Sequence, residues 1–244
     1  MARIDLRMGD IASIVGPTGS GKTTLINDLE LLTDGDTPTG RRILVDGASP
    51  TAAHRDGPAS NPIALITQHT TFLSDMPVRE FLATHARVRG GGRSEERALV
   101  DETLVFANQL TGEPVPAAGR MTELSGGQAR ALLIADAAVI CRTPVVLLDE
   151  VENAGIDRAR ALELLRRYRK TFVFVTHDPH IALLSDYRLV MREGAVTNLI
   201  HTSEEERRLS GRVSRLDESL ALLRQRIRLG ESLSLRDLTW EERP

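Results

Sequence analysis

A glycine-rich segment near the start of the chain constrains the fold more than any other feature. It reads Gly16-Pro17-Thr18-Gly19-Ser20-Gly21-Lys22-Thr23 and fits the pattern G-x-x-x-x-G-K-[ST]. The β-branched run 11–15 precedes it, and a helix-compatible segment, 22–32, follows it. A strand, a glycine loop and a helix in this order allow backbone amides to surround a phosphate. The segment therefore predicts an α/β domain that holds a nucleoside triphosphate.

The residue types of this segment suit the phosphates of a nucleotide. Glycine lets the backbone approach closely, and the start of the following helix adds its positive end. Lys22 is expected to reach the β- and γ-phosphates, and the Thr23 hydroxyl to ligate Mg²⁺. Lysine occurs only here and at Lys170 among 31 basic residues, and this position needs a compact ammonium. The predicted nucleotide-binding residues of the segment are Gly16, Pro17, Thr18, Gly19, Ser20, Gly21, Lys22, Thr23 and Thr24.

Charged side chains follow two further apolar runs. Asp149 and Glu150 come directly after the run 145–148, and His177 follows the run 172–175. In parallel sheets, ligands bind at the edge where the strands end. Asp149 is expected to hold the magnesium shell, and Glu150 to orient or deprotonate an attacking water. His177 is expected to contact the γ-phosphate or that water.

The segment Leu124-Ser125-Gly126-Gly127-Gln128 makes the prediction more specific. Together the patterns resemble the nucleotide-binding domain of the ATP-binding cassette (ABC) family, in the same order and over nearly the whole chain. Generic phosphate-loop enzymes lack the signature. In this resemblance the segment 16–23 matches the Walker A loop, and the segment 124–128 matches the signature. Gln68 matches the Q-loop, and His177 matches the switch histidine. Asp149 and Glu150 match the end of the Walker B strand and its catalytic glutamate.

The resemblance implies an ATPase that works as a head-to-tail pair. Each ATP would lie between the Walker A loop of one cassette and the signature of another, either a second copy or a related chain. Ser125, Gly126, Gly127 and Gln128 would then form a second cradle for the phosphates. The implied magnesium ligands are Thr23, Gln68 and Asp149. Gln68 would also link the core to a helical insertion on which a partner chain docks.

The order of expected elements predicts an α/β phosphate-loop core with a mainly parallel sheet. Strands are expected at 11–15, 43–45, 63–67, 145–148, 172–175 and 189–191, with helices at 22–32, 126–140, 157–169 and 179–184. Loops are expected at 33–40 and 48–62. Helical segments between 77 and 110 break at 90–92. We therefore expect an ATP-binding domain at 1–202, with a helical subdomain inserted at about 75–140, and a C-terminal extension at 203–244.

The C-terminal extension carries a heptad stripe on an expected amphipathic helix. Its members recur at spacings of four and three residues among arginines and glutamates, and they are Leu209, Val213, Leu216, Leu220, Leu223 and Ile227. The pattern fits a helix packed on its own domain as well as it fits a contact with a second copy or a partner.

The composition of the chain limits the partners and the cellular location that we expect for it. The chain has 244 residues with a net charge of −3, and its one basic cluster, 166–170, suits a solvated helix face, so no nucleic-acid partner is expected. Its single cysteine, Cys141, excludes a disulfide framework and is expected to be a buried, inert thiol. No apolar run approaches the roughly 18 residues of a membrane helix, and no targeting segment is seen. We expect a cytoplasmic protein that reaches the inner face of a membrane through a partner.

Two functions fit these expectations. The first is the ATP-binding subunit of a membrane transporter, with separate permease chains. The second is a soluble ABC-type ATPase that remodels or reactivates a cofactor-dependent client enzyme. Two departures from the family pattern point to the second function: no aromatic residue precedes Phe72 to stack on adenine, and the segment after Glu150 makes Asp157 an uncertain equivalent of the D-loop aspartate. A DNA-repair ATPase and a cassette without turnover fit less well, because long coiled coils are absent and Lys22, Glu150 and His177 are present.

Overall fold

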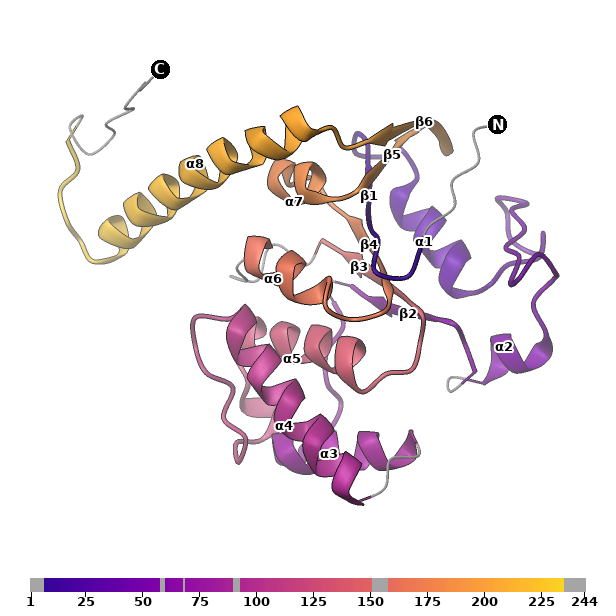
Figure 1. Ribbon diagram of the computed structural model, residues 1–244, viewed down its shortest axis with the longest axis horizontal. Helices are drawn as coiled ribbons and strands as arrows, with labels where there is room; N and C mark the ends of the chain where they lie inside the picture. The colour runs from indigo at the N-terminus through magenta and orange to yellow at the C-terminus, as the bar shows by residue number, and fades with distance from the viewer. Residues whose placement is uncertain (1–6, 58–59, 68, 90–92, 151–157, 235–244) are drawn as a thin grey trace.

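The computed structural model describes residues 7–57, 60–67, 69–89, 93–150 and 158–234 (Figure 1). Elements of the first half are β1 (Ile11–Val15), α1 (Lys22–Glu30), α2 (Ala52–Asp56), β2 (Ile63–Ile66), α3 (Val78–Val88), α4 (Arg93–Leu110) and the 3₁₀ turn Met121–Glu123. They are followed by α5 (Gly126–Val139), β3 (Val145–Asp149), α6 (Arg158–Leu165), β4 (Thr171–Val175), α7 (Pro179–Leu184), β5 (Tyr187–Arg192), β6 (Ala195–His201) and α8 (Glu204–Arg228).

The sheet has the order β2-β3-β4-β1-β5-β6 and is parallel from β2 to β5. The central strands β3 and β4 are built mainly of Val, Leu and Phe because helices cover both faces of a parallel sheet. This architecture confirms the predicted mainly parallel α/β core. The last strand, β6, was not predicted. It pairs antiparallel with β5 through a tight turn at Glu193 and Gly194, both at positive φ, as a two-residue hairpin requires.

Strand register brings the ends of three strands to one edge. Ile14 of β1 and Asp149 of β3 both lie opposite Val175 of β4. The segments that follow β1, β3 and β4 therefore leave the sheet side by side. The glycine-rich loop follows the first, Glu150 the second and His177 the third.

The helices α3, α4 and α5 pack against each other beneath the sheet in Figure 1. One apolar core joins them to the strands, with Leu82 of α3, Phe106 of α4, Leu132 of α5 and Phe172 of β4 among its buried members. The expected helical segments at 77–110 are thus present. The expected break at 90–92 lies outside the described residues. We retain the boundaries of the helical subdomain, 75–140, as a proposal.

Two local expectations were wrong. Residues 43–45 form no strand, because the segment makes only isolated bridges, Asp34 with Arg42 and Val45 with Ala48. The expected loop at 48–62 contains α2, which the Thr51 hydroxyl caps by accepting from the His54 amide at 3.3 Å. None of the α2 side chains is buried, so no apolar periodicity marks this helix in the sequence.

The helix α8 extends along one side of the molecule from β6 (Figure 1). Its first turn is capped by Ser203, and Arg207 contacts Asp186 at 3.2 Å. Beyond this turn, four of its six heptad side chains are exposed, among them Leu216 at 39% and Ile227 at 60%, whereas Val213 and Leu223 are half-buried. The helix α8 also packs against α7, so both alternatives, packing on its own domain and contact with a second copy or a partner, stay open. Within the part of the chain that the structure describes, no helix is both long and apolar enough to span a membrane.

Candidate functional site

The glycine-rich loop between β1 and α1 has the conformation that an anion cradle needs. Gly19 and Gly21 have φ values of +79° and +91°, which side chains rarely allow. A Cβ on Gly16 would lie 2.4 Å from the Met191 carbonyl oxygen, so this glycine packs against β5. The start of α1 has no side-chain cap, which leaves its first amides available to a ligand. These features fit a bound phosphate group.

Lys22 and Ser20 point their polar groups into this loop. The Lys22 ammonium donates to the carbonyl oxygens of Gly16 at 2.9 Å and Pro17 at 3.2 Å, and only 7% of the residue is exposed. The buried Ser20 hydroxyl has no hydrogen-bond partner. A buried hydroxyl without a partner is unfavourable unless a ligand or water completes it. Of the remaining predicted residues, Pro17, Thr18, Thr23 and Thr24 are exposed around the loop.

The edge beside β1 brings two predicted side chains together. Asp149 ends β3 and is 9% exposed, whereas Glu150 turns away through a left-handed backbone with φ of +49°. The Glu150 amide donates to the Val175 carbonyl at 3.0 Å, which fixes this turn against β4. The Glu150 carboxylate lies 3.6 Å from Nε2 of His177. The left-handed backbone stores strain of about 1 kcal/mol or more, as functional positions often do.

The signature segment begins α5 with a capping box. The Ser125 hydroxyl accepts from the Gln128 amide at 3.3 Å, and the Ser125 amide donates to Oε1 of Gln128 at 2.9 Å. Gln128 also donates through Nε2 to the Pro114 carbonyl at 2.8 Å. The hydroxyl proton of Ser125 and the amides of Gly126 and Gly127 are not used by this cap. Ser125 and Gly126 are exposed, so these donors face solvent at a helix N-terminus.

The predicted residues fall into two groups within one chain. The phosphate loop, Asp149, Glu150 and His177 share the strand edge. The hydrogen bonds of the signature stay within its own segment and reach Pro114, not the phosphate loop. Gln68 and Asp157 lie outside the described residues, so their predicted roles stay predictions.

Sequence reasoning missed a polar cluster that supports the phosphate loop from behind. Asp28 of α1 is nearly buried and accepts from Arg41 at 2.6 Å, from Thr39 at 2.9 Å and from Thr37 at 3.2 Å. Arg41 also donates to the Gly194 carbonyl, in the turn that packs on Gly21. Burial raises the pKa of Asp28, but the bonds from Arg41, Thr39 and Thr37 outweigh it and leave the pKa below its ordinary value. These partners lie 9 to 13 residues from Asp28 along the chain, in a polar loop. No sequence pattern at this spacing predicts that they meet.

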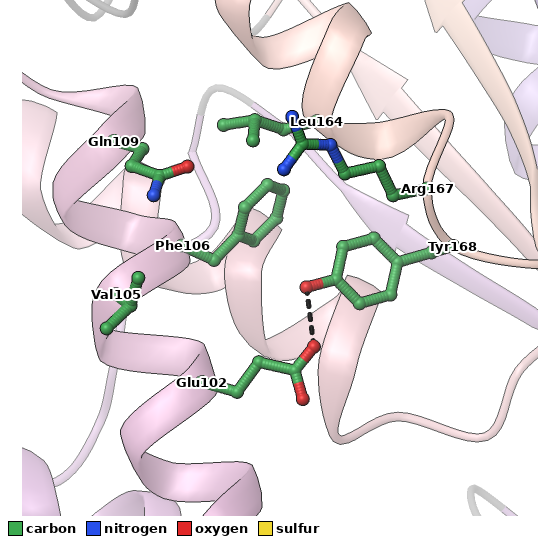
Figure 2. A pocket seen from close by; sticks show the side chains of 7 residues that line it. All are labelled: Glu102, Val105, Phe106, Gln109, Leu164, Arg167 and Tyr168. Atoms are coloured by element: carbon green, nitrogen blue, oxygen red, sulfur yellow. Dashed lines mark hydrogen bonds between the residues drawn. The ribbon is translucent and has the colours of Figure 1, made fainter.

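A hollow of about 280 Å³ lies apart from the strand edge, between α4 and the segment after α6 (Figure 2). The Tyr168 hydroxyl donates to Glu102 across it at 2.8 Å. Burial, with the adjacent carboxylate, raises the pKa of Tyr168. Its lining is Glu102, Val105, Phe106, Gln109, Leu164, Arg167 and Tyr168. None of the predicted site residues lines it, so it is separate from the candidate site.

Known proteins resemble this chain in sequence and in structure. The family model described as ABC transporter matches residues 2–153. An uncharacterized ABC transporter ATP-binding protein of Methanocaldococcus jannaschii is 47% identical, over 97% of this chain and 89% of its own length. The methionine import ATP-binding protein MetN 2 of Pseudomonas aeruginosa is 34% identical over 80% of this chain. The chain spans 58% of the length of that second relative.

A solved structure also resembles this chain and supports its fold. The dimeric post-hydrolysis state of an ATP-binding cassette, bound to ADP and Pi, has a TM-score of 0.64. It covers 82% of this chain and 88% of its own chain, at 24% identity. At this identity the likeness establishes the fold, and the family rests on the sequence matches. The chain belongs to the ABC transporter family and is an ATP-binding cassette, an ATPase.

Proposed function

We propose that this cassette is the ATP-binding subunit that energises a membrane transporter. The observation that carries the proposal is the shared strand edge, where the phosphate loop, Asp149, Glu150 and His177 follow three adjacent strands. The relatives named as transporter and import ATP-binding proteins favour this function over the remodelling of a soluble client enzyme.

The phosphate loop would bind the triphosphate of ATP. The uncapped amides of α1 and the buried Ser20 hydroxyl supply hydrogen-bond donors, and the Lys22 ammonium supplies a positive charge. Lys22 would exchange its bonds to the Gly16 and Pro17 carbonyls for bonds to the β- and γ-phosphates. Thr23 and Asp149, together with Gln68, would hold Mg²⁺. The ion, when bound, neutralises charge that develops on the phosphates.

Glu150 and His177 would carry the hydrolytic step. Glu150 would accept a proton from the attacking water, since its carboxylate lies at the same edge as the phosphate loop. His177, 3.6 Å from that carboxylate, would hold the water or the γ-phosphate in line. The backbone of Glu150 is anchored to Val175, which fixes where its side chain leaves the strand edge before ATP binds.

Two cassettes would assemble each site. The Ser125 hydroxyl and the amides of Gly126 and Gly127 form a second set of donors, and Gln128 fixes their geometry. We infer that they contact the ATP held by a second cassette, either another copy or a related chain. A separate membrane permease would complete the transporter, and the cassette would lie at the cytoplasmic face of the membrane. Residues 1–202 would form the ATP-binding domain and residues 203–244 an extension.

The variant Glu150→Gln tests this proposal. It keeps the size of the side chain but removes the proton acceptor, so we expect ATP to bind while hydrolysis falls by at least about a hundredfold. ATP should then stabilise a dimer, measured by light scattering after gel filtration. The control Glu204→Gln changes a side chain that is 88% exposed and should hydrolyse ATP normally. Normal turnover by Glu150→Gln would refute the assigned general base.

A further inference from the structure

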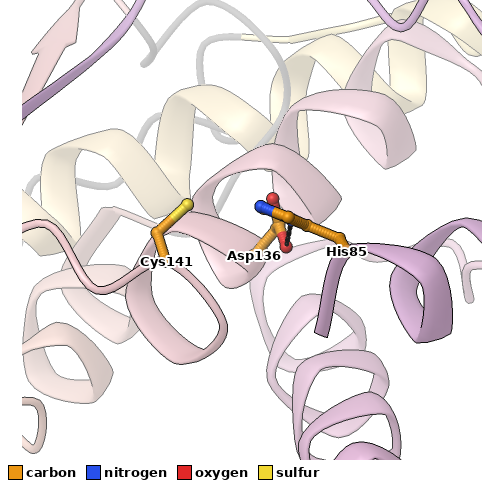
Figure 3. A group of neighbouring side chains, drawn as sticks. All are labelled: His85, Asp136 and Cys141. Carbon is orange, nitrogen blue, oxygen red and sulfur yellow. Dashed lines mark hydrogen bonds and ion pairs between the residues drawn. The ribbon is translucent and has the colours of Figure 1, made fainter. Parts of the chain in front are cut away.

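Three side chains of types that can bind metal ions lie together within the helical layer (Figure 3). They are His85 on α3, Asp136 on α5 and Cys141 directly after α5. Their imidazole nitrogen, carboxylate oxygen and thiol sulfur all lie within 4.8 Å of one another. Cys141 is the only cysteine in the chain and is half-buried, so the expectation of a buried thiol was wrong, while its inertness stays a prediction.

The backbone holds these side chains in place. The Cys141 amide donates to the Asp136 carbonyl at 3.0 Å, so the end of α5 fixes the spacing of the carboxylate and the thiol. Lys170 donates to the carbonyl oxygens of Ala137 and Cys141, which anchors the same turn. Nδ1 of His85 lies 2.8 Å from Oδ1 of Asp136 and thereby joins α3 to α5. The cluster is therefore built before any ligand arrives.

We propose that His85, Asp136 and Cys141 bind a thiophilic divalent cation of the Zn²⁺ class. A thiolate, an imidazole and a carboxylate form a donor set that suits Zn²⁺, whereas Mg²⁺ and Ca²⁺ prefer oxygen ligands. Three protein ligands leave the fourth tetrahedral position to water. The His85 side chain is 21% exposed and that of Asp136 is 10% exposed, which gives an ion an approach from solvent.

Little movement separates the His85–Asp136 pair from the spacing of two metal ligands. Zinc–nitrogen and zinc–oxygen distances of about 2.0–2.1 Å at a tetrahedral angle place the two ligand atoms about 3.3 Å apart. The observed separation between His85 and Asp136 is 2.8 Å. An opening of about half an ångström would let the cation take the place of the proton between them.

The charged groups around the cluster have opposite effects on the binding of a cation. The carboxylate of Asp136 lies beside Nδ1 of His85, so a positive charge is favoured at this point. Against this, Arg89 lies 3.3 Å from Nε2 of His85. When Nδ1 binds a metal, Nε2 carries the ring proton, and Arg89 must then turn away because two donors face each other. Arg89 therefore opposes the cation through both its charge and its hydrogen bond.

A bound cation would connect α3 to the turn that leads from α5 into β3. The signature begins α5 at its other end, so the ion would stiffen the helix that presents Ser125. This role is structural and does not require nucleotide.

Cobalt titration of untagged, nucleotide-free protein tests the site. Co²⁺ replaces Zn²⁺ and gives near-ultraviolet charge-transfer absorption when a thiolate binds it. We expect one equivalent to give this band, and Zn²⁺ to bleach it. Cys141→Ser should abolish the band, and His85→Gln should weaken Co²⁺ binding at least about tenfold. The control His54→Gln should behave like the wild type, because His54 lies in α2.

The variant Arg89→Gln sharpens the test because it predicts a gain. Loss of the opposing cation should tighten Co²⁺ and Zn²⁺ binding several-fold, with circular dichroism verifying that each variant is folded. Absence of the thiolate band in both the wild type and Arg89→Gln would overturn the proposal. Retention of the band at wild-type affinity in His85→Gln would overturn it as well. Neither result would affect the proposed ATPase function, which uses other residues.

Discussion

At the scale of single residues, the candidate ATP site depends on side chains and glycines held by close packing. Gly16 touches β5 so closely that a methyl group has no room. Glu150 occupies a left-handed backbone that places its carboxylate beside His177. Asp28 holds the loop behind the phosphate loop by accepting hydrogen bonds from Arg41 and two threonines. A substitution at Gly16 and one at Asp28 each lead to a separate testable prediction.

Replacement of Gly16 by alanine should damage the phosphate loop. The new Cβ would lie 2.4 Å from the Met191 carbonyl and 2.8 Å from the Ser20 hydroxyl, so the backbone must shift. We expect the midpoint of urea unfolding to fall and binding of a fluorescent ATP analogue to be lost. Gly211→Ala is the control, since a Cβ there meets open space within α8. It should raise stability by up to about 1 kcal/mol. Unchanged nucleotide binding by Gly16→Ala would contradict the close packing.

Replacement of Asp28 by asparagine should destabilise the protein by about 3 kcal/mol at neutral pH, because it leaves the partly buried Arg41 without a counter-ion. The folded-state pKa of Asp28 is lowered, so its contribution is present above the ordinary pKa of 3.8 and is lost as the pH falls through the lowered value. The difference between wild type and variant, measured by urea unfolding, should shrink in acid. Asp101→Asn removes a half-exposed partner of Arg79 and should change stability by less than about 1 kcal/mol. An equal loss for both variants would argue against the Asp28 cluster.

At the scale of elements, α5 and α8 differ in how much of each helix is buried by neighbouring elements. The core buries Leu132 of α5 completely, whereas Leu216 and Leu220 of α8 are 39% and 45% exposed. Both helices have serine caps, at Ser125 and Ser203. Local sequence therefore starts both helices. Burial in the domain core stabilises α5, whereas α8 packs against α7 and leaves much of its apolar stripe exposed.

The double variant Leu216→Gln/Leu220→Gln should separate folding from association. Since both side chains are exposed, we expect the unfolding midpoint to change by less than the equivalent of about 1 kcal/mol. Contact with a second copy should weaken, measured by sedimentation velocity at several concentrations. By comparison, Leu132→Ala should lose about 2–5 kcal/mol. A large loss of stability in the α8 variant would show that the stripe packs on its own domain, and unchanged sedimentation would show that it does not mediate self-association.

At the scale of the whole molecule, the proposed ATP site is divided between two regions of the chain. The phosphate loop and Glu150 share the strand edge, while the signature begins a helix in the layer below the sheet. A head-to-tail pair of copies would bring the two regions together. Mixed variants test this arrangement directly.

A mixture of Lys22→Ala with Gly126→Asp should recover ATPase activity that neither variant has alone. In a head-to-tail pair of the two, one site combines both defects, and the other combines an intact phosphate loop with an intact signature. We expect turnover to appear on mixing and to depend on protein concentration. Each variant mixed with itself is the control. Failure to recover activity, with both variants folded, would contradict a site shared between chains.

The sequence determined the strands and the chemistry that follows them. The phosphate loop, Asp149, Glu150 and His177 could be recognised because apolar runs, glycines and charged residues occur at short, regular spacings. The same local signals predicted α5, α7 and the start of α8. They failed at 43–45, where three apolar residues have no neighbouring strand, and at β6, whose pairing with β5 comes from the hairpin turn.

The tertiary structure alone decided which distant residues meet. Asp28 with Arg41, and His85 with Asp136 and Cys141, are separated along the chain by intervals that carry no periodic signal. Sheet order and helix packing bring them into contact, because burial of the apolar core fixes where each strand and helix ends. The sequence alone thus specified an ATP-binding cassette, and the packing of its elements produced the cluster for which we propose a metal ion.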